Sequence, residues 1–288
     1  MIGISSPVRS IYTLGPEGTY SEKAARRLQE LLRKKGPGEP PQVIYTRTLP
    51  EVLARTEADV ESLGVLPLEN SDTGTVAQAQ DALGQHKVRI LLEISLKVIF
   101  DLLANGPLEN VKALYTQPVA LDQCGRYLSK NLPGAETVLT HSNSESGELY
   151  LRGRGKGVVA AIVLPEFAER HPAERVARGI QNYQHNTTRF VVVGAVSMAG
   201  EPDLSRAKST LLVDPMEDRP GLLYDILSVF KRHGLNLTRL ESRPASGRAW
   251  TYVFYLDIIN NPSIGEALEE FRREGIRVNL LGSYDSLE

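Results

Sequence analysis

The stretch NTTRFVVVG, residues 186–194, combines a polar start with an apolar run and is informative about both the fold and the function. Its apolar half predicts a buried strand, while an amide, two threonines and an arginine stand at its entrance. Because side chains alternate between the two faces of a strand, Thr188 and Phe190 are expected on one face. Thr187 and Arg189 are then expected on the other. The alternative is a polar strand entrance in which threonine serves only its β propensity.

Short apolar runs alternate with helical patterns on the N-terminal side of this stretch. The strand-like runs lie at residues 10–14, 62–68, 111–116 and 157–163, each followed by a helical pattern. Such alternation predicts an α/β fold with a largely parallel sheet and helices on its faces. Since the strand at 189–196 returns after a long excursion, we expect two lobes joined by crossing strands.

The C-terminal side of the chain has a different pattern. It reads strand, helix, strand, strand, helix, strand, which is the order of an α+β ferredoxin-like unit (βαββαβ). A polar segment with Gly and Pro comes before it and predicts a linker. We therefore expect one domain at 8–197, a linker at 198–207 and a second domain at 208–288.

Several helix starts are marked in the sequence. Thr19 with Glu22 fits a capping box, as does Ser263 with Glu266. Pro220 is expected in the first turn of a helix. A capped helix start with free N–H groups favours an anion, although the same pattern also occurs at ordinary helix starts.

Composition excludes several classes of function. The chain has 288 residues and a formal net charge of -2, so no broad nucleic-acid surface is expected. The single cysteine, Cys124, excludes an internal disulfide or a multi-cysteine zinc site and is expected to be a buried packing residue. Neither a signal peptide nor a membrane-spanning helix is expected, because charges interrupt residues 88–104. These features predict a cytoplasmic protein.

Uncharged polar side chains follow several of the predicted strands. They lie in the loops at residues 15–25, 67–78, 114–128 and 138–149. In an open α/β sheet, ligands bind beyond the carboxyl ends of the strands. Each loop alone also fits plain turn chemistry. Together they predict a site of neutral donors for an anion, without a metal cluster, a Ser-His-Asp spacing or a P-loop.

Four segments, in this order, resemble the signatures of prephenate dehydratase. They are GPEGTYSEKAA (15–25), GVLPLENSDTGTV (64–76), QPVALDQC (117–124) and NTTRFVVVG (186–194). The segment DRPGLLYDILSVFKRHGLNLTRLESRP (218–244) resembles the ACT regulatory domain. The resemblance implies a two-lobed catalytic domain similar to type II periplasmic binding proteins, followed by an ACT domain. It also implies loss of CO₂ and water from prephenate to give phenylpyruvate, in phenylalanine biosynthesis, without a metal or organic cofactor.

The resemblance assigns roles to individual residues. Thr188 falls on the proposed catalytic threonine. Substrate contacts are expected from Gly18, Thr19, Asn70, Ser71, Thr116, Gln123, Ser142, Arg189 and Phe190. The effector L-phenylalanine is expected between the ACT domains of a homodimer or homotetramer, at Pro220, Gly221, Leu222, Leu223, Asn236, Leu237, Glu241, Ser242, Arg243 and Pro244. Its binding is expected to close the cleft and inhibit. No nucleic acid or membrane partner is implied.

The chain departs from the family pattern at Gln117, Asn143 and Leu222, where the family often has histidine, threonine and alanine. These departures leave the choice of substrate open. The alternatives are an arogenate dehydratase, which uses the aminated substrate, and a non-catalytic phenylalanine sensor. A solute-binding protein would leave the ACT segment unexplained. A decarboxylase without dehydration would not need Thr188.

Overall fold

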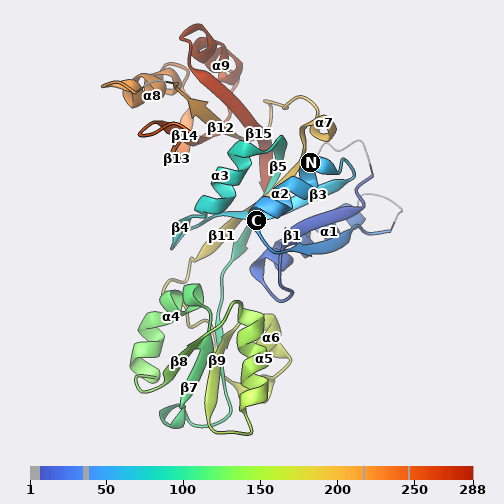
Figure 1. Ribbon diagram of the computed structural model, residues 1–288, viewed down its shortest axis with the longest axis vertical. Coiled ribbons are helices and arrows are strands. Elements are labelled where there is room, and N and C mark those ends of the chain that lie inside the picture. The colour runs from blue at the N-terminus through green and yellow to red at the C-terminus, as the bar shows by residue number, and fades with distance from the viewer. Residues whose placement is uncertain (1–6, 35–38, 217, 246, 288) are drawn as a thin grey trace.

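The computed structural model describes residues 7–34, 39–216, 218–245 and 247–287. Three bodies follow one another along the long axis of the molecule (Figure 1). The first lobe lies in the middle, the second lobe lies at the bottom in green and yellow, and the C-terminal domain lies at the top in orange and red. Among the helices of these ranges, none is both long and apolar enough to cross a membrane.

The first lobe is an α/β unit built around five neighbouring strands. In spatial order they are β2 (Gln42–Thr46), β1 (Ser10–Leu14), β3 (Ser62–Asn70), β11 (Thr187–Ala195) and β5 (Val88–Lys97). The short β4 (Gly74–Thr75) pairs with the end of β3. The helices are α1 (Tyr20–Arg33), α2 (Leu49–Ala58), α3 (Ala77–Gln85) and the short α7 (Val196–Ala199). The apolar runs of β3 and β11 are buried because helices pack on the sheet.

The second lobe has its own five-stranded sheet. The strands, in spatial order, are β10 (Arg175–Ala177), β6 (Asp101–Ala104), β9 (Val159–Val163), β7 (Ala113–Thr116) and β8 (Glu136–Leu139). The helices are α4 (Pro118–Asn131), α5 (Asn143–Gly153) and α6 (Pro165–Glu169), with 3₁₀ turns at Leu108–Asn110 and Pro172–Glu174. The chain passes between the lobes after β5 and returns after β10, which confirms the two-lobed prediction.

The prediction of largely parallel sheets holds only for part of each lobe. In the first lobe β1 pairs in parallel with β2 and β3, whereas β11 is antiparallel to both β3 and β5. In the second lobe β7 is parallel to β8 and β9, whereas β6 is antiparallel to β9. The reason is topological: a strand that returns from the other lobe enters the sheet from the opposite end.

The C-terminal domain has the predicted βαββαβ order. Its elements are β12 (Lys208–Asp214), α8 (Leu222–Arg232), β13 (Asn236–Pro244), β14 (Tyr252–Ile259), α9 (Ile264–Arg273) and β15 (Arg277–Leu287). The four strands are antiparallel, in the order β13-β14-β12-β15. Both helices pack on one face of this sheet, around Phe230 and Phe271.

The C-terminal domain is joined to the first lobe by backbone pairing, which the sequence did not predict. The end of β15 runs parallel to β5, with Gly282 opposite Ile90 and Leu287 opposite Ile94. Any Cβ at Gly282 would collide with the carbonyl oxygen of Ile90, so only glycine permits this approach. The two domains therefore share one ten-stranded sheet.

The structure corrects the placement of Pro220 and the capping role of Ser263, although Ser263 is the N-cap residue of α9 as predicted. Helix α8 begins at Leu222 after Gly221, whose φ of 82° ends the preceding turn, so Pro220 lies outside the helix. Ser263 precedes α9, but its side chain makes no cap, and its backbone N–H instead donates to Asn261 Oδ1 at 2.8 Å. Asn261 thus forms a turn that leads into the helix and does not cap the first-turn N–H groups.

The capping of α1 by Thr19 is confirmed, but the Glu22 carboxylate reaches Gly18, one residue before the N-cap of an ideal capping box. The N–H of Glu22 donates to Thr19 Oγ1 at 3.3 Å, and the carboxylate of Glu22 accepts from the N–H of Gly18 at 2.6 Å.

Candidate active site

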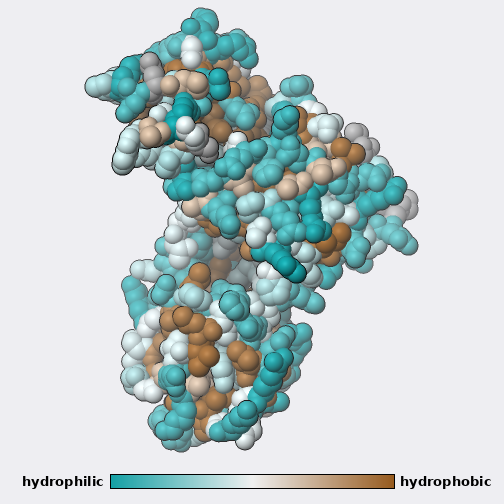
Figure 2. Space-filling model, in the orientation of Figure 1, coloured by the Kyte–Doolittle hydropathy of each residue, from teal (hydrophilic) through white to brown (hydrophobic). Residues whose placement is uncertain are grey.

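A cavity of about 330 Å³ lies between the two lobes. In Figure 2 the molecule narrows at this level, between the first lobe and the second. The first lobe and its strands β3 and β11 contribute Leu14, Gly15, Pro16, Thr19, Tyr20, Ser21, Pro67, Asn70, Thr73, Val76, Thr188 and Phe190. The crossing segment and the second lobe contribute Val98, Phe100, Gln117, Val119, Gln123, His141, Ser142 and Asn143. The size suits a small organic molecule.

Asn70, at the end of β3, is the centre of the hydrogen bonds on one wall of this cavity. Its side-chain amide donates to Thr188 Oγ1 at 2.9 Å and to Asn186 Oδ1 at 2.7 Å. Its side-chain oxygen accepts from the N–H groups of Asp72 and Thr73 and, at 3.2 Å, from Gln123 Nε2. Because Gln123 belongs to α4 of the second lobe, this last bond joins the two lobes at the site.

Thr188 lies opposite Asn70 in the β3–β11 ladder, and both side chains face the cavity. Asn70 and Gln123 are nearly buried, with exposures of 7% and 3%, whereas Thr188 is half-buried. Since the Thr188 hydroxyl accepts from Asn70, its own proton is left to donate to a bound molecule. The hydrogen bond from Asn70 therefore holds the Thr188 hydroxyl in place, and the hydroxyl proton remains available to donate.

The described lining of the cavity holds no Lys, Arg, Asp or Glu. Its titratable side chains are Tyr20 and His141. Burial raises the pKa of Tyr20 well above its usual value. The Tyr20 hydroxyl donates to the carbonyl of Ile99 at 2.8 Å and accepts from the N–H of the same residue, so it holds the crossing segment to the first lobe. The site is thus polar but largely uncharged.

Helix N-termini from both lobes border the site. Helix α1 begins after Thr19, and α5 begins after Ser142, whose Oγ accepts from the N–H of Glu145 at 3.1 Å. Helix N-termini favour anions, because their free N–H groups and the helix dipole point outward. Asn143 is 4% exposed, and its buried Oδ1 has no hydrogen-bond partner. This orphaned acceptor lies in the lining, so a donor on a bound molecule can satisfy it.

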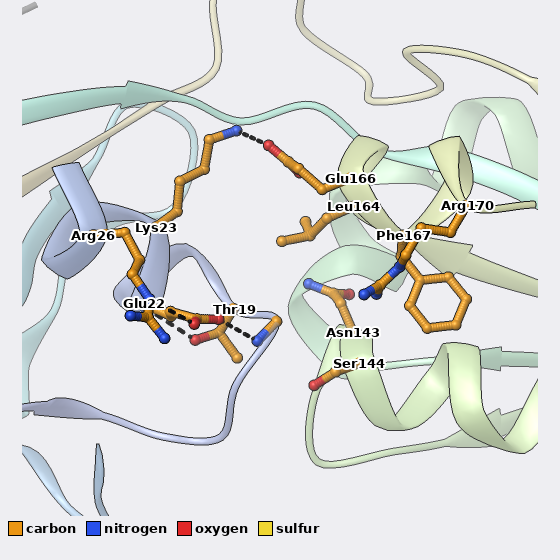
Figure 3. A pocket seen from close by; sticks show the side chains of 11 residues that line it. Thr19, Glu22, Lys23, Arg26, Asn143, Ser144, Leu164, Glu166, Phe167 and Arg170 are labelled. Carbon is orange, nitrogen blue, oxygen red and sulfur yellow. Dashed lines mark hydrogen bonds and ion pairs between the residues drawn. The ribbon is translucent and has the colours of Figure 1, made fainter. Parts of the chain in front are cut away.

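A second cavity, of about 270 Å³, adjoins the first and shares Thr19 and Asn143 with it. Figure 3 shows side chains of α1 facing those of α5 and α6 across it. Lys23 forms an ion pair with Glu166 that bridges the lobes (Figure 3). The lining also carries Arg26 and Arg170. The neighbouring cavity thus carries Lys and Arg side chains, which the described lining of the first cavity does not.

The structure brings together most of the residues that the sequence analysis selected for substrate. Those that line the first cavity are Thr19, Asn70, Gln123, Ser142, Thr188 and Phe190. Gly18 lines the second cavity. Two of the three departures from the family pattern, Gln117 and Asn143, also line the first.

Three of the selected residues do not line either cavity. Thr116 is fully buried, and its hydroxyl donates to the carbonyl of Gln117. Ser71 is exposed, and its Oγ accepts from the N–H of Thr187 at 2.9 Å. Arg189 points to the opposite face of β11, into a cluster of carboxylates. The structure therefore does not support direct substrate contact for these three side chains.

Two residues that help to form the site were not among those predicted. Asn186 is 1% exposed and accepts from Asn70, and its own Nδ2 is buried without a partner. Asn186 lies in the segment NTTRFVVVG (186–194), two residues before Thr188, and this spacing places both side chains on the same face of a strand. Tyr20 had no such signal, because its contact with Ile99 joins residues 79 positions apart.

The residues selected for phenylalanine lie at the start of α8 and along β13. Leu222 is 6% exposed and belongs to the domain core, and Leu237 packs against that core. The departure at Leu222 is therefore accommodated by core packing. Along β13, Ser242 and Pro244 are exposed.

Glu241 and Arg243 face the first lobe instead. Glu241 accepts from Thr75 Oγ1 at 3.0 Å, and Arg243 makes two bonds to the carboxylate of Asp81, at 2.8 and 2.6 Å. All three side chains were expected at the phenylalanine site, but strand alternation places Glu241 and Arg243 on one face of β13 and Ser242 on the other.

Comparison with known proteins gives a consistent result for both domains. Residues 11–197 match the family model for prephenate dehydratase, and residues 210–275 match that for the ACT domain. The prephenate dehydratase of Methanocaldococcus jannaschii is 34% identical over 95% of this chain and 97% of its own. The bifunctional chorismate mutase/prephenate dehydratase of Aquifex aeolicus is 32% identical over 94% of this chain and 72% of its own. Among solved structures, the prephenate dehydratase of Arthrobacter aurescens in complex with L-Phe superposes with a TM-score of 0.79 at 29% identity, covering 96% of this chain and 90% of that one.

Proposed function

Because the chain belongs to the prephenate dehydratase family, we propose that prephenate binds in the cavity between the lobes and that Thr188 assists the departure of its hydroxyl group. The enzyme is a lyase that removes CO₂ and water from prephenate to give phenylpyruvate, in phenylalanine biosynthesis. The observation that carries the assignment of roles is the hydrogen-bonded set of Thr188, Asn70 and Gln123, which spans both lobes.

The chemistry suits an uncharged polar site. Prephenate is a dianion, and loss of one carboxylate with the ring hydroxyl gives an aromatic ring, so the driving force lies in the substrate. A cation placed on the departing carboxylate would stabilise the ground state more than the transition state, because that charge leaves as neutral CO₂. Neutral, preorganised donors avoid this loss. They fit the described lining, which has no charged side chain of Lys, Arg, Asp or Glu.

The proposed role of Thr188 follows from its hydrogen bonds. Asn70 donates to Thr188 Oγ1 at 2.9 Å, which orients the threonine proton away from Asn70. That proton can bond to the leaving hydroxyl as negative charge develops on it. A threonine hydroxyl is a weak acid, so the contribution is a strong hydrogen bond or partial proton transfer. Such assistance is typically worth about 10²–10⁴-fold in rate.

The carboxylates of prephenate need a separate set of donors. We assign the binding of these carboxylates to the N-termini of α1 and α5, at Thr19, Ser142 and Asn143, which face the cavity from the two lobes. Closure of the lobes around the substrate would bring these helix ends together. Gly18 allows the start of α1 to lie close to Ser144 on α5. Its φ of 78° and the closeness of Ser144 leave little room for a side chain at this position.

The ACT domain is proposed to bind L-phenylalanine between paired subunits and thereby to inhibit the enzyme. The start of α8 and the exposed face of β13 are the surfaces for this contact, at Ser242 and Pro244 among others. Binding between subunits requires an oligomer, for which we propose a homodimer or homotetramer, and we expect the enzyme in the cytoplasm.

The decisive experiment offers prephenate and arogenate separately to the pure protein and follows phenylpyruvate and phenylalanine. We expect turnover of prephenate, with kcat/KM reduced when phenylalanine is added. Turnover of arogenate alone would replace the assigned substrate with its aminated analogue. Phenylalanine binding without turnover of either compound would identify a sensor and contradict the enzymatic assignment.

A further inference from the structure

Arg189 follows Thr188 in β11, but its side chain lies on the other face of the sheet, against the C-terminal domain. Its Nη1 is 2.5 Å from Glu69 Oε2, on β3. Its Nε and Nη2 lie 3.0 and 2.6 Å from Glu93 Oε2, on β5. Its Nη2 is also 2.8 Å from Asp257 Oδ2, on β14. One guanidinium thus joins the two strands that flank β11 to the ACT domain.

The cluster is largely buried, and its three carboxylates face the cations of Arg189 and Lys208. The side chains of Glu93 and Asp257 are 5% and 0% exposed, and that of Arg189 is 17% exposed. Burial alone raises the pKa of Glu93, but the charges of Arg189 and Lys208 outweigh it and hold the pKa below its usual value. Lys208 Nζ lies 3.1 Å from Glu93 Oε2. Removal of one partner would leave a buried charge uncompensated, which is strongly destabilising to the local arrangement.

The cluster lies directly behind the proposed catalytic pair. In the β3–β11 ladder Thr188 is opposite Asn70, and the next pair is Arg189 opposite Glu69. The register of this ladder shifts between Arg189 and Phe190. Regular pairing is therefore interrupted immediately beside the site, and such irregularities re-aim side chains. The ion pair of Arg189 with Glu69 holds the strand ends together at that point.

The ACT domain touches the same region through alternate residues of β13. Arg239 Nη2 donates to Thr75 Oγ1 at 3.0 Å, and its Nε lies 3.7 Å from Glu69 Oε1. Glu241 accepts from the same Thr75 hydroxyl. The strand that carries the proposed effector surface on one face thus contacts, with its other face, the loop that follows Asn70.

We propose that Arg189 is a positioning residue that transmits the placement of the ACT domain, through Asp257 and Glu69, to the strand ends that carry Thr188 and Asn70. A shift of β13 and β14 when phenylalanine binds would move Asp257 relative to Arg189. The guanidinium would then displace the paired ends of β3 and β11 and change the distance between Thr188 and its substrate. The inference rests on the proposed function of the cavity.

The first test changes the ACT side of the contact. Asp257→Asn keeps the shape of the side chain and an oxygen for its bond with Thr210, but it removes the charge that faces Arg189. The quantity measured is the ratio of kcat/KM without and with saturating phenylalanine, which should be well above 1 in the wild type. We expect this ratio to fall toward 1 while the affinity for phenylalanine, measured by calorimetry, stays near that of the wild type. An unchanged ratio, or a wild type whose kcat/KM does not respond to bound phenylalanine, overturns the inference.

The matched control is Asp285→Asn. Asp285 lies on β15, where its carboxylate pairs with Arg206 at 2.9 Å, and it does not touch Arg189. The substitution is chemically the same and removes an ion pair near the interface of the domains. We expect it to leave the phenylalanine response intact. A loss equal to that of Asp257→Asn would show that any weakening of the interface suffices and would remove the specific role of Arg189.

A second test changes the arginine. Arg189→Lys keeps the charge but cannot bond to carboxylates on three strands at once, because lysine presents a single ammonium group. We expect kcat to fall by roughly 10–100-fold with KM little changed, since small misplacements of a reacting group cost about that much. A purely structural role would lower the melting temperature but leave kcat of the folded fraction unchanged, and this result would contradict the proposal.

Hydrogen exchange separates this inference from the proposed function. In the wild type, phenylalanine should change amide protection in residues 68–71 and 187–189, and Asp257→Asn should abolish the change. If neither prephenate nor arogenate is turned over, the function of the cavity is wrong, yet this exchange measurement still decides the coupling. Should Asp257→Asn fail to fold, Glu69→Gln replaces it, because Glu69 is 28% exposed and its loss is less disruptive.

Discussion

The substitution Thr188→Val tests the proposed chemistry most directly. Valine has nearly the shape of threonine and suits a strand, so it removes the hydroxyl and little else. Asn70 Nδ2 would lose its 2.9 Å bond to Thr188 but keep Asn186 Oδ1 at 2.7 Å and the Thr187 carbonyl at 3.3 Å. The expected loss of stability is therefore only about 1 kcal/mol, the net value of one hydrogen bond.

The expected loss of activity is much larger. If the hydroxyl supplies general acid assistance, kcat falls by about 10²–10⁴-fold, which corresponds to roughly 3–5 kcal/mol in the activation barrier. The assay follows phenylpyruvate at saturating prephenate, alongside thermal unfolding of the same sample. Thr188→Ser is the control, and it should retain measurable activity because it keeps the hydroxyl. A valine variant that is as fast as the wild type would remove Thr188 from the mechanism.

Three further predictions concern the fold around the site. Gly84→Ala places a Cβ against the Tyr255 hydroxyl and should lower the free energy of unfolding by about 1–3 kcal/mol in urea titrations. The double variant with Tyr255→Phe should recover stability, and no recovery would show that this clash is not the cause. Burial raises the pKa of Glu93, but the charge of Arg189 outweighs it and lowers that pKa in the folded state, so Glu93 binds its proton more readily when unfolded. The stabilisation by Glu93 is then fully present above its unfolded pKa and is lost as the pH falls through its folded pKa. Glu93→Gln should therefore flatten the acid side of the curve of unfolding free energy against pH. Equal slopes for the variant and the wild type would contradict this. Burial raises the pKa of Cys124 to about 12, so a thiol reagent at pH 8 should label the protein only after unfolding, and rapid labelling of the native enzyme would contradict this.

Much of the architecture could be predicted because it depends on local pattern. The strand runs at 10–14 and 62–68 and the βαββαβ order of the second domain are visible as apolar periodicity, and the structure confirms them. Helix α5 went unrecognised because its polar start, Asn143 to Ser146, was interpreted as loop. The pairing of β15 with β5 joins segments that are distant along the chain, and no local signal indicates it.

In the site, too, local patterns could be predicted from the sequence, and contacts between distant segments could not. Thr188 and Asn70 could be selected because polar residues at strand ends are visible in sequence, and strand alternation placed Thr188 and Arg189 on opposite faces. The motif nevertheless led to the assignment of Arg189 to the substrate. Its real partners, Glu93 and Asp257, lie 96 and 68 positions away. Sequence spacing cannot show contacts of that length, so this assignment required the structure.

The shared sheet has a consequence for the order in which the protein is made. Strand β5 is paired on one side by β11 and on the other by β15, whose residues follow those of β5 by about 190 positions. At a synthesis rate of about 5–20 residues per second, β5 waits roughly 10–40 s for its second neighbour. During that time one edge of the first lobe is open to pairing with other chains. A chain cut after residue 197 would keep this edge of β5 open, whereas β15 of the ACT domain covers it in the structure.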